Sequence, residues 1–127
     1  MKHKVLFILH VPPPIHGSSV VGQQIFSSIL INKTFSTKYL NINSSSNFNQ
    51  LGKKNFSKFF TILKIYLKLI IDLIYFKPDL CYFALNSKGI AFYRDLIVVF
   101  LLKIFNKKII YHLHNKGIKG REKNIFY

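Results

Sequence analysis

The segment from Lys4 to Val11 reads KVLFILHV, an apolar run in which hydrophobic and polar residues hardly alternate. Runs of this kind are typical of strands that are buried on both faces, as in parallel sheets. The loop Pro12–Gly17 (PPPIHG) follows, and Ser18 or Ser19 can cap a helix that extends to about Asn32. The opening part of the chain therefore predicts a strand, a loop and a helix.

The rest of the chain repeats this alternation of strands and helices. Pro78 ends the longest helix, because the residue before a proline disfavours helical backbone. The order β-α-β-α-β-α-β predicts one α/β domain over residues 1–127, with a Rossmann-like parallel sheet and helices on both faces. We expect the strand order 3-2-1-4, which makes the first and fourth strands neighbours. The other predicted strands cover 37–42, 79–85 and 108–113, and the other helices cover 53–77 and 90–105.

The charge of the chain is strongly unbalanced. Nineteen lysines and arginines against four acidic residues give a net charge of +15 over 127 residues. This charge favours an anionic partner, either phosphate groups or an acidic membrane surface, although lysines that only solvate the surface explain it equally well. A nucleic acid is the weakest candidate, because the sequence has no helix-turn-helix, zinc-finger or RNA-recognition motif.

Two features bear on the compartment. The single cysteine, Cys81, lies in an apolar run, and one cysteine forms no disulfide within a chain, which fits a reducing cytoplasm and a buried, inert thiol. The apolar segment 59–76 is interrupted by Lys64, Lys68 and Asp72, whose i, i+4 spacing places them on one polar stripe of a helix. We therefore expect no transmembrane helix.

Four of the five histidines lie at the ends of two predicted strands. His10 and His16 belong to the end of the first, and His112 and His114 to the end of the fourth. Ligands of open α/β sheets bind beyond the carboxyl ends of the strands, so we expect these two loops to converge on one crevice. His10 and His112 also fit buried, structural positions, which is the alternative interpretation. No carboxylate or cysteine accompanies the histidines at a familiar ligand spacing, so we expect no metal site.

Gly17 and Gly22 flank the start of the first predicted helix. A glycine at position 17 lets the backbone approach a ligand closely, and the free N–H groups of a helix N-terminus attract anions. The G-x-G-x-x-G fingerprint of dinucleotide binding is absent, and an ordinary strand-to-helix turn explains Gly17 equally well. No two carboxylates pair for general acid and base catalysis; they are Asp72, Asp79, Asp95 and Glu122.

Two segments resemble one known family. KVLFILHVPPPIHGSSVVGQQI (4–25) and KPDLCYFALNSKGIAFYRDLIVVFLLKIFNKKIIYHLHNKG (77–117) are similar to successive parts of the N-terminal domain of family 4 glycosyltransferases. That family has the GT-B fold, in which two Rossmann-like domains face each other across a cleft. The resemblance makes residues 1–127 an incomplete acceptor-side domain, with the C-terminal donor-binding domain absent, and we expect no turnover from this part alone.

The resemblance also implies a reaction and its residues. The family transfers a sugar from a nucleotide-sugar donor to a saccharide or lipid-linked acceptor, usually with retention and without a metal, in cell-surface polysaccharide synthesis. Gly17 and Ser18 match a glycine-bearing loop near the donor phosphates, with Gly-Ser where many members have Gly-Gly. His114 matches the histidine that approaches the donor sugar, which makes it the expected catalytic residue. His16 and Asn115 are the further substrate-binding residues that the match implies.

Family members often act at the inner face of the membrane, so we expect a cytoplasmic protein that is peripheral on the plasma membrane. Lysines of the predicted helix 53–77 can reach lipid phosphates while its apolar side chains enter the interface. The simpler interpretation is that this helix only packs on the sheet. Arg94 and Asp95 match a recurring Arg-Asp pair that we expect to be structural. The alternative function is a non-catalytic, basic module that binds membranes peripherally.

Overall fold

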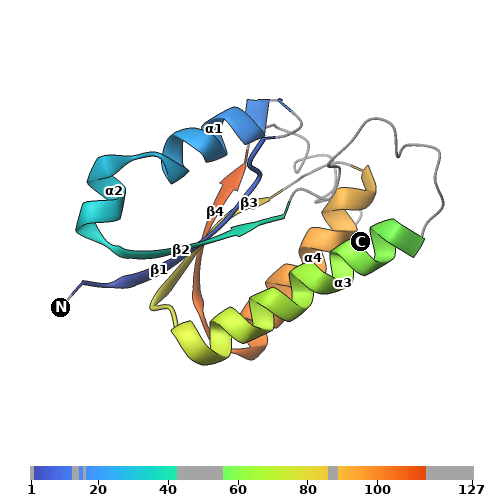
Figure 1. Ribbon diagram of the computed structural model, residues 1–127. Coiled ribbons are helices and arrows are strands. Elements are labelled where there is room, and N and C mark those ends of the chain that lie inside the picture. Colours follow the sequence, from blue (N-terminus) through green and yellow to red (C-terminus); the bar gives the residue numbers. More distant parts are fainter. Residues whose placement is uncertain (1, 13–14, 16, 43–55, 86–88, 114–127) are drawn as a thin grey trace, which may run out of the picture.

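The structure, a computed structural model, describes residues 2–12, 15, 17–42, 56–85 and 89–113. Its centre is one sheet of four parallel strands, with helices on both faces (Figure 1), which confirms the predicted α/β fold class. The strands are β1 (Lys4–Leu9), β2 (Ser36–Asn41), β3 (Leu80–Leu85) and β4 (Lys108–Leu113).

The order of the strands differs from the prediction. It is β2-β1-β3-β4 rather than 3-2-1-4, so β1 lies between β2 and β3, and within the described residues β4 pairs with β3 alone. The physical reason lies in the side chains. β3 is buried along most of its length and suits a position inside the sheet, whereas β2 has one buried residue, Leu40, as an edge position allows. The point where the chain reverses its direction across the sheet is therefore between β1 and β3.

The connections follow from this order. The chain steps one way from β1 to β2 and the opposite way from β2 through β3 to β4. Because parallel crossovers are right-handed, opposite directions place their helices on opposite faces of the sheet. Figure 1 shows this arrangement, with α1 (Gly17–Phe26) and α2 (Ile29–Thr34) on one face and α3 (Phe56–Ile71) and α4 (Gly89–Ile104) on the other.

The helix expected to extend to about Asn32 is in fact two helices. Ser28 has an extended backbone, and its side-chain oxygen accepts a hydrogen bond of 3.3 Å from the N–H of Ile31. A serine in this role caps a new helix, and a cap requires non-helical backbone at its own position, so α1 ends before it. The two short helices then follow the twisted sheet and cover Val5, Phe7 and Leu9.

The opposite face holds the larger part of the core. Leu6, Ile8 and Phe83 of the sheet pack against Leu69 of α3 and Leu102 of α4, all of them buried. α3 continues into a π-helical turn, η2 (Asp72–Phe76), and ends where Lys77 adopts the left-handed conformation (φ 51°) before Pro78. The predicted helix 53–77 is therefore correct at its C-terminal end, and its first residues, 53–55, lie outside the described part.

Asp72 does not lie on the helix face that the sequence predicted. It was predicted to share a polar stripe with Lys64 and Lys68, and those two lysines are exposed, but Asp72 is buried and its Oδ1 lies 2.8 Å from Lys38 Nζ of β2. An α-helix has 3.6 residues per turn, so each step of four residues advances about 40° beyond a full turn. The stripe therefore drifts around α3, and by Asp72 it faces the sheet.

Candidate functional site

The carboxyl end of β1 fixes the position of α1. His10 follows β1 and is buried, and the backbone of α1 passes so close to it that a Cβ on Gly22 would overlap the carbonyl oxygen of His10. Glycine is the residue that permits this approach of helix to strand. Gly22, which the sequence marked only as flanking the start of the helix, thus holds the middle of α1 against the exit of β1.

The neighbouring strand holds the same edge from the other side. The N–H of Val11 donates to Asn41 Oδ1 at 3.2 Å, and the N–H of Ile42 donates to the carbonyl oxygen of Leu9 at 2.9 Å. These bonds tie the exit of β1 to the exit of β2. The sequence carried a signal for them in Asn41, a side chain with a hydrogen-bond acceptor at the end of a predicted strand, which was not among the predicted site residues.

The first turn of α1 is suited to an anion. Gly17 begins the helix and is exposed, and a Cβ added to it would meet nothing within 4 Å. The N–H groups of a first turn have no partners within the helix and carry the positive end of its dipole. No acidic residue lies in this turn. Gly17 and the half-buried Ser18, both predicted site residues, therefore lie where a negatively charged group can approach the backbone.

The predicted adjacency of the first and fourth strands is wrong, and the loop that follows the fourth strand, 114–117, lies outside the described residues. His112 lies near the end of β4, and β3 separates that strand from β1. Neighbouring strands are about 4.8 Å apart, so the exits of β1 and β4 are separated by roughly 10 Å. In the observed order the exit of β1 lies beside the exit of β3.

His112 has a partner on β3. Its Nδ1 lies 2.5 Å from the hydroxyl of Tyr82, and both side chains are half-buried. Burial raises the pKa of the Tyr82 hydroxyl, which keeps it protonated as a hydrogen-bond donor. Together with the burial of His10, this contact supports the structural alternative for both histidines.

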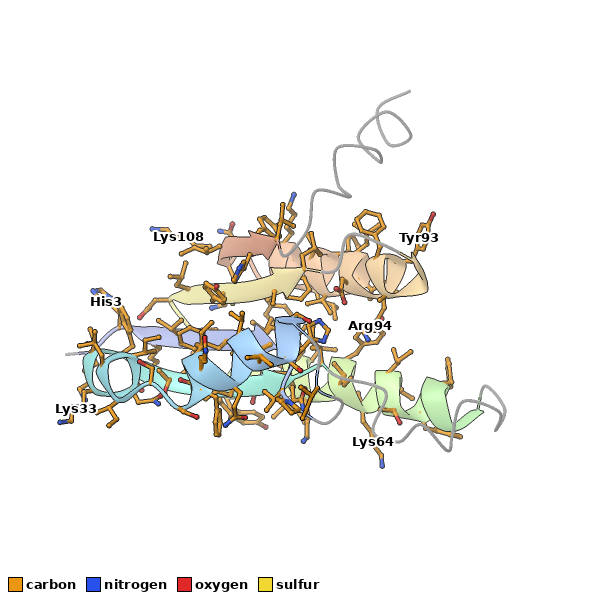
Figure 2. The ribbon with its side chains drawn as sticks, turned by 90° about the horizontal axis from the view of Figure 1, so that it is seen from above. His3, Lys33, Lys64, Tyr93, Arg94 and Lys108 are labelled. Carbon is orange, nitrogen blue, oxygen red and sulfur yellow. The ribbon has the colours of Figure 1, made fainter. Side chains whose placement is uncertain are left out.

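Arg94 and Asp95 form a buried ion pair early in α4. Nε and Nη2 of Arg94 each lie 3.0 Å from Oδ1 of Asp95, which is fully buried. The hydroxyl of Tyr66 on α3 donates to the carbonyl oxygen of Arg94 at 3.2 Å, and Arg94 lies on the side of α4 that faces α3 (Figure 2). Burial raises the pKa of Tyr66, with a lowering effect from Arg94. The ion pair lies within α4, and the hydrogen bond from Tyr66 joins α3 to α4 beside it.

Three of the predicted site residues, His16, His114 and Asn115, lie outside the described residues, as does Glu122. Of the remaining acidic residues, Asp79 precedes β3, and its Oδ2 accepts a hydrogen bond of 2.9 Å from the N–H of Lys4. Asp79 therefore fastens the amino end of the sheet, far from the carboxyl edge that holds Gly17.

Metal and thiol chemistry find no support in the described residues. They contain no group of three histidine, cysteine or acidic side chains that could hold a metal ion. Cys81 is buried, and burial raises the pKa of its thiol to about 11, which makes it unreactive at neutral pH. Within the same residues, no helix combines the length and apolarity that crossing a bilayer requires.

Comparisons of the chain with protein-family models, with curated proteins and with solved structures gave no match.

Proposed function

We propose that the chain is the N-terminal, acceptor-side half of a GT-B glycosyltransferase, which transfers a sugar from a nucleotide-sugar donor to a saccharide or lipid-linked acceptor. The observation that carries this proposal is the start of α1. Its first turn is open at Gly17 and has no acidic residue, and Gly22 holds the middle of the same helix against the exit of β1. The resemblance of segment 4–25 to the first strand, loop and helix of family 4 enzymes supports the same assignment.

The chemistry fits the charges of the chain. A departing nucleoside diphosphate is stabilised by positive groups and helix N-termini rather than by a carboxylate acting as acid or base. Asp72 and Asp95 are buried and engaged in ion pairs, so neither is free for acid–base work. In this proposal Gly17 and Ser18 receive the diphosphate, His114 approaches the donor sugar, and His16 and Asn115 contact substrate.

The binding step can be tested on the 127-residue chain with UDP and GDP as probes, by isothermal titration calorimetry. Gly17→Ala adds a methyl group that meets no protein atom, so it leaves the melting temperature unchanged while it weakens nucleotide binding about tenfold. Gln24→Ala, at an exposed position of the same helix, is the matched control and leaves binding unchanged. Equal nucleotide affinity in all three proteins, or no nucleotide binding, contradicts the assignment of Gly17 and Ser18 to the diphosphate.

The catalytic step requires the protein as its own cells make it. Its intact mass is the first measurement, because a donor-binding half would raise the mass well above 14.9 kDa. Sugar transfer is then assayed with and without His114→Ala, for which we expect a loss of at least about a hundredfold. Full transfer by the His114→Ala protein would remove that residue from the mechanism, and transfer by residues 1–127 alone would overturn the assignment as half of an enzyme.

A further inference from the structure

α3 and η2 carry two apolar stripes on opposite sides. The inner stripe, which contains Ile65, Leu69 and Leu73, is buried against the sheet. The outer stripe recurs with helical spacing at i, i+3, i+7, i+11 and i+14, and its side chains are 40–57% exposed. A helix needs only the inner stripe to pack on a sheet, so packing does not explain the outer one. The outer stripe consists of Phe60, Leu63, Leu67, Ile71 and Ile74.

α4 repeats this two-sided pattern. Its inner side buries Phe92, Val98 and Leu102, while five large apolar or aromatic side chains on its outer side are 39–64% exposed. A single exposed apolar residue is ordinary, but five on one side of a helix are not. These outer residues are Tyr93, Leu96, Ile97, Phe100 and Ile104.

The two outer sides belong to one surface. α3 and α4 contact each other and lie side by side on the same face of the sheet (Figure 1), and the hydrogen bond from Tyr66 to the carbonyl oxygen of Arg94 joins them. In Figure 2, Arg94 lies between the two helices, whereas Lys64 lies on the flank of α3 that faces away from α4. We call the outer side of α3, η2 and α4 the outer apolar surface.

The charges of this surface have one sign. Among the described side chains of these helices (59–76 and 91–104), every exposed one is aliphatic, aromatic or lysine. The lysines are Lys64, Lys68 and Lys103, and both carboxylates of the same segments, Asp72 and Asp95, are buried. A partner of this surface must therefore bury apolar groups and supply negative charge.

We propose that the outer apolar surface docks flat on an anionic lipid bilayer. A bilayer offers both requirements at once, since its acyl region receives Phe100, Leu67 and their neighbours while its lipid phosphates receive the lysines. A second copy of the chain offers apolar groups but no negative charge, because it would bring lysines against lysines with no exposed carboxylate opposite them. The proposal goes beyond sugar transfer and holds whether or not that activity is found.

The docked orientation has a geometric consequence. With α3 and α4 lying in the plane of the interface, the strands run along the membrane, because these helices pack lengthwise on the sheet. The carboxyl edge with Gly17 then opens sideways, parallel to the lipid surface. A ligand held by its own lipid tail reaches that edge without leaving the membrane.

The test uses the full 127-residue chain in co-sedimentation with vesicles of phosphatidylcholine alone and with about 30% phosphatidylglycerol. We expect binding to the anionic vesicles, little binding to the neutral ones, and partial release at about 0.5 M salt. In a titration with lipid, the double variant Leu67→Ser, Phe100→Ser lowers the partition constant for anionic vesicles about tenfold or more. The control, Ile29→Ser with Leu30→Ser, removes two more exposed residues from the opposite face and leaves binding unchanged.

Circular dichroism establishes that each variant is folded, and Ile71→Ser with Ile104→Ser serves as a second test pair. Lys64→Gln with Lys68→Gln is expected to weaken binding to anionic vesicles and to lower its salt dependence. Failure to bind anionic vesicles overturns the proposal, as does equal loss in the test pair and the control. A dimer in sedimentation velocity that the Leu67→Ser, Phe100→Ser pair dissociates, without vesicle binding, assigns the surface to a second copy instead. None of these assays contains a nucleotide, so their outcome is independent of the proposed transferase activity.

Discussion

The two helical layers of this molecule pack on the sheet in similar ways, but the side chains that they expose to solvent differ. Both bury apolar side chains against the strands, with Ile25 and Ile31 on one face and Leu69 and Leu102 on the other. On the solvent side, α1 and α2 interleave exposed apolar residues with polar ones. The described side chains of α3 and α4 (59–71 and 91–104) that are exposed are all apolar, aromatic or lysine. The exposed polar residues of the first layer are Gln23, Gln24, Ser27, Asn32, Lys33 and Thr34.

This difference shows that the inner and outer sides of a helix are subject to separate constraints. The inner side must complete the core, and the fold fails without it. The outer side is free of that requirement, so its composition reports on what the layer meets in the cell. The layers also differ in how closely they approach the sheet, since α1 passes against backbone at Gly22 and the other layer packs through long side chains.

The largest expected effect separates the two sides of α3. Leu69→Ala removes a fully buried side chain and should lower the free energy of unfolding by about 3 kcal/mol. Leu67→Ala, two residues earlier on the outer stripe, should change it by less than about 0.5 kcal/mol. Urea unfolding followed by circular dichroism measures both. Similar losses in the two variants would mean that the outer stripe is part of a core, which would contradict the difference between the two sides of α3.

The next effect tests how α1 approaches the sheet. Gly22→Ala places a methyl group into the carbonyl oxygen of His10, so α1 must shift, at a cost of about 2 kcal/mol. Gly17→Ala, in open space on the same helix, should stay within about 0.5 kcal/mol of the parent protein. A Gly22→Ala protein as stable as the parent would show that α1 lies farther from β1 than described.

A smaller effect concerns the ion pair that joins η2 to β2. Lys38→Ala leaves the carboxylate of Asp72 buried without its partner, and because Lys38 is itself about half exposed we expect a loss of about 1 kcal/mol. Lys33→Ala, an exposed lysine of α2, should cause no measurable loss. Thermal unfolding at low and high salt gives both values. A loss that does not shrink with salt would point to packing of the lysine stem on Phe76 rather than to charge.

The smallest effect is kinetic and uses Cys81 as a reporter beneath α3 and α4. With its pKa raised to about 11, the thiol of the folded protein is about 0.1% ionised at pH 8, so it should react with a disulfide reagent only when the layer opens. The raised pKa also means that this group's contribution to stability is present below pH 9.0 and is lost as the pH rises through about 11. Labelling at pH 8 as fast as that of the unfolded chain would show that the layer is loose.

The sequence predicted the elements of the fold better than their arrangement. The apolar runs of β1 and β3 and the exact span of β4 could be predicted because each pattern is local. The order of the strands could not, because the direction of a crossover is decided by which strands bury their side chains together. Ser28 and Asp72 were misinterpreted for a related reason, since each depends on a cap or a rotation that a fixed helical period does not represent.

The features of the candidate site could also be predicted only in part. The place of Gly17 at the start of a helix on the carboxyl edge follows from a strand, a loop and a glycine in sequence, and the structure confirms that position. The convergence of His10 with His112 depended on the predicted strand order and failed with it. The contacts of Asn41, Tyr66 and Tyr82 involve partners 28 to 30 residues away, which no local pattern indicates.

The central position of β1 has a consequence for how the chain is made. β1 leaves the ribosome before the other three strands of the described sheet, and its two neighbours arrive at different times, with Ser36 of β2 well before Leu80 of β3. The bond between Lys4 and Asp79 joins residues 75 apart in sequence, more than twice the separation of Lys4 and Ser36. Until β3 emerges, the nascent chain holds its most apolar strand with one edge unpaired, a state that invites chaperone binding. Pairing of the second edge of β1 is then timed by translation of residues 42 to 85 rather than by the speed of any local step.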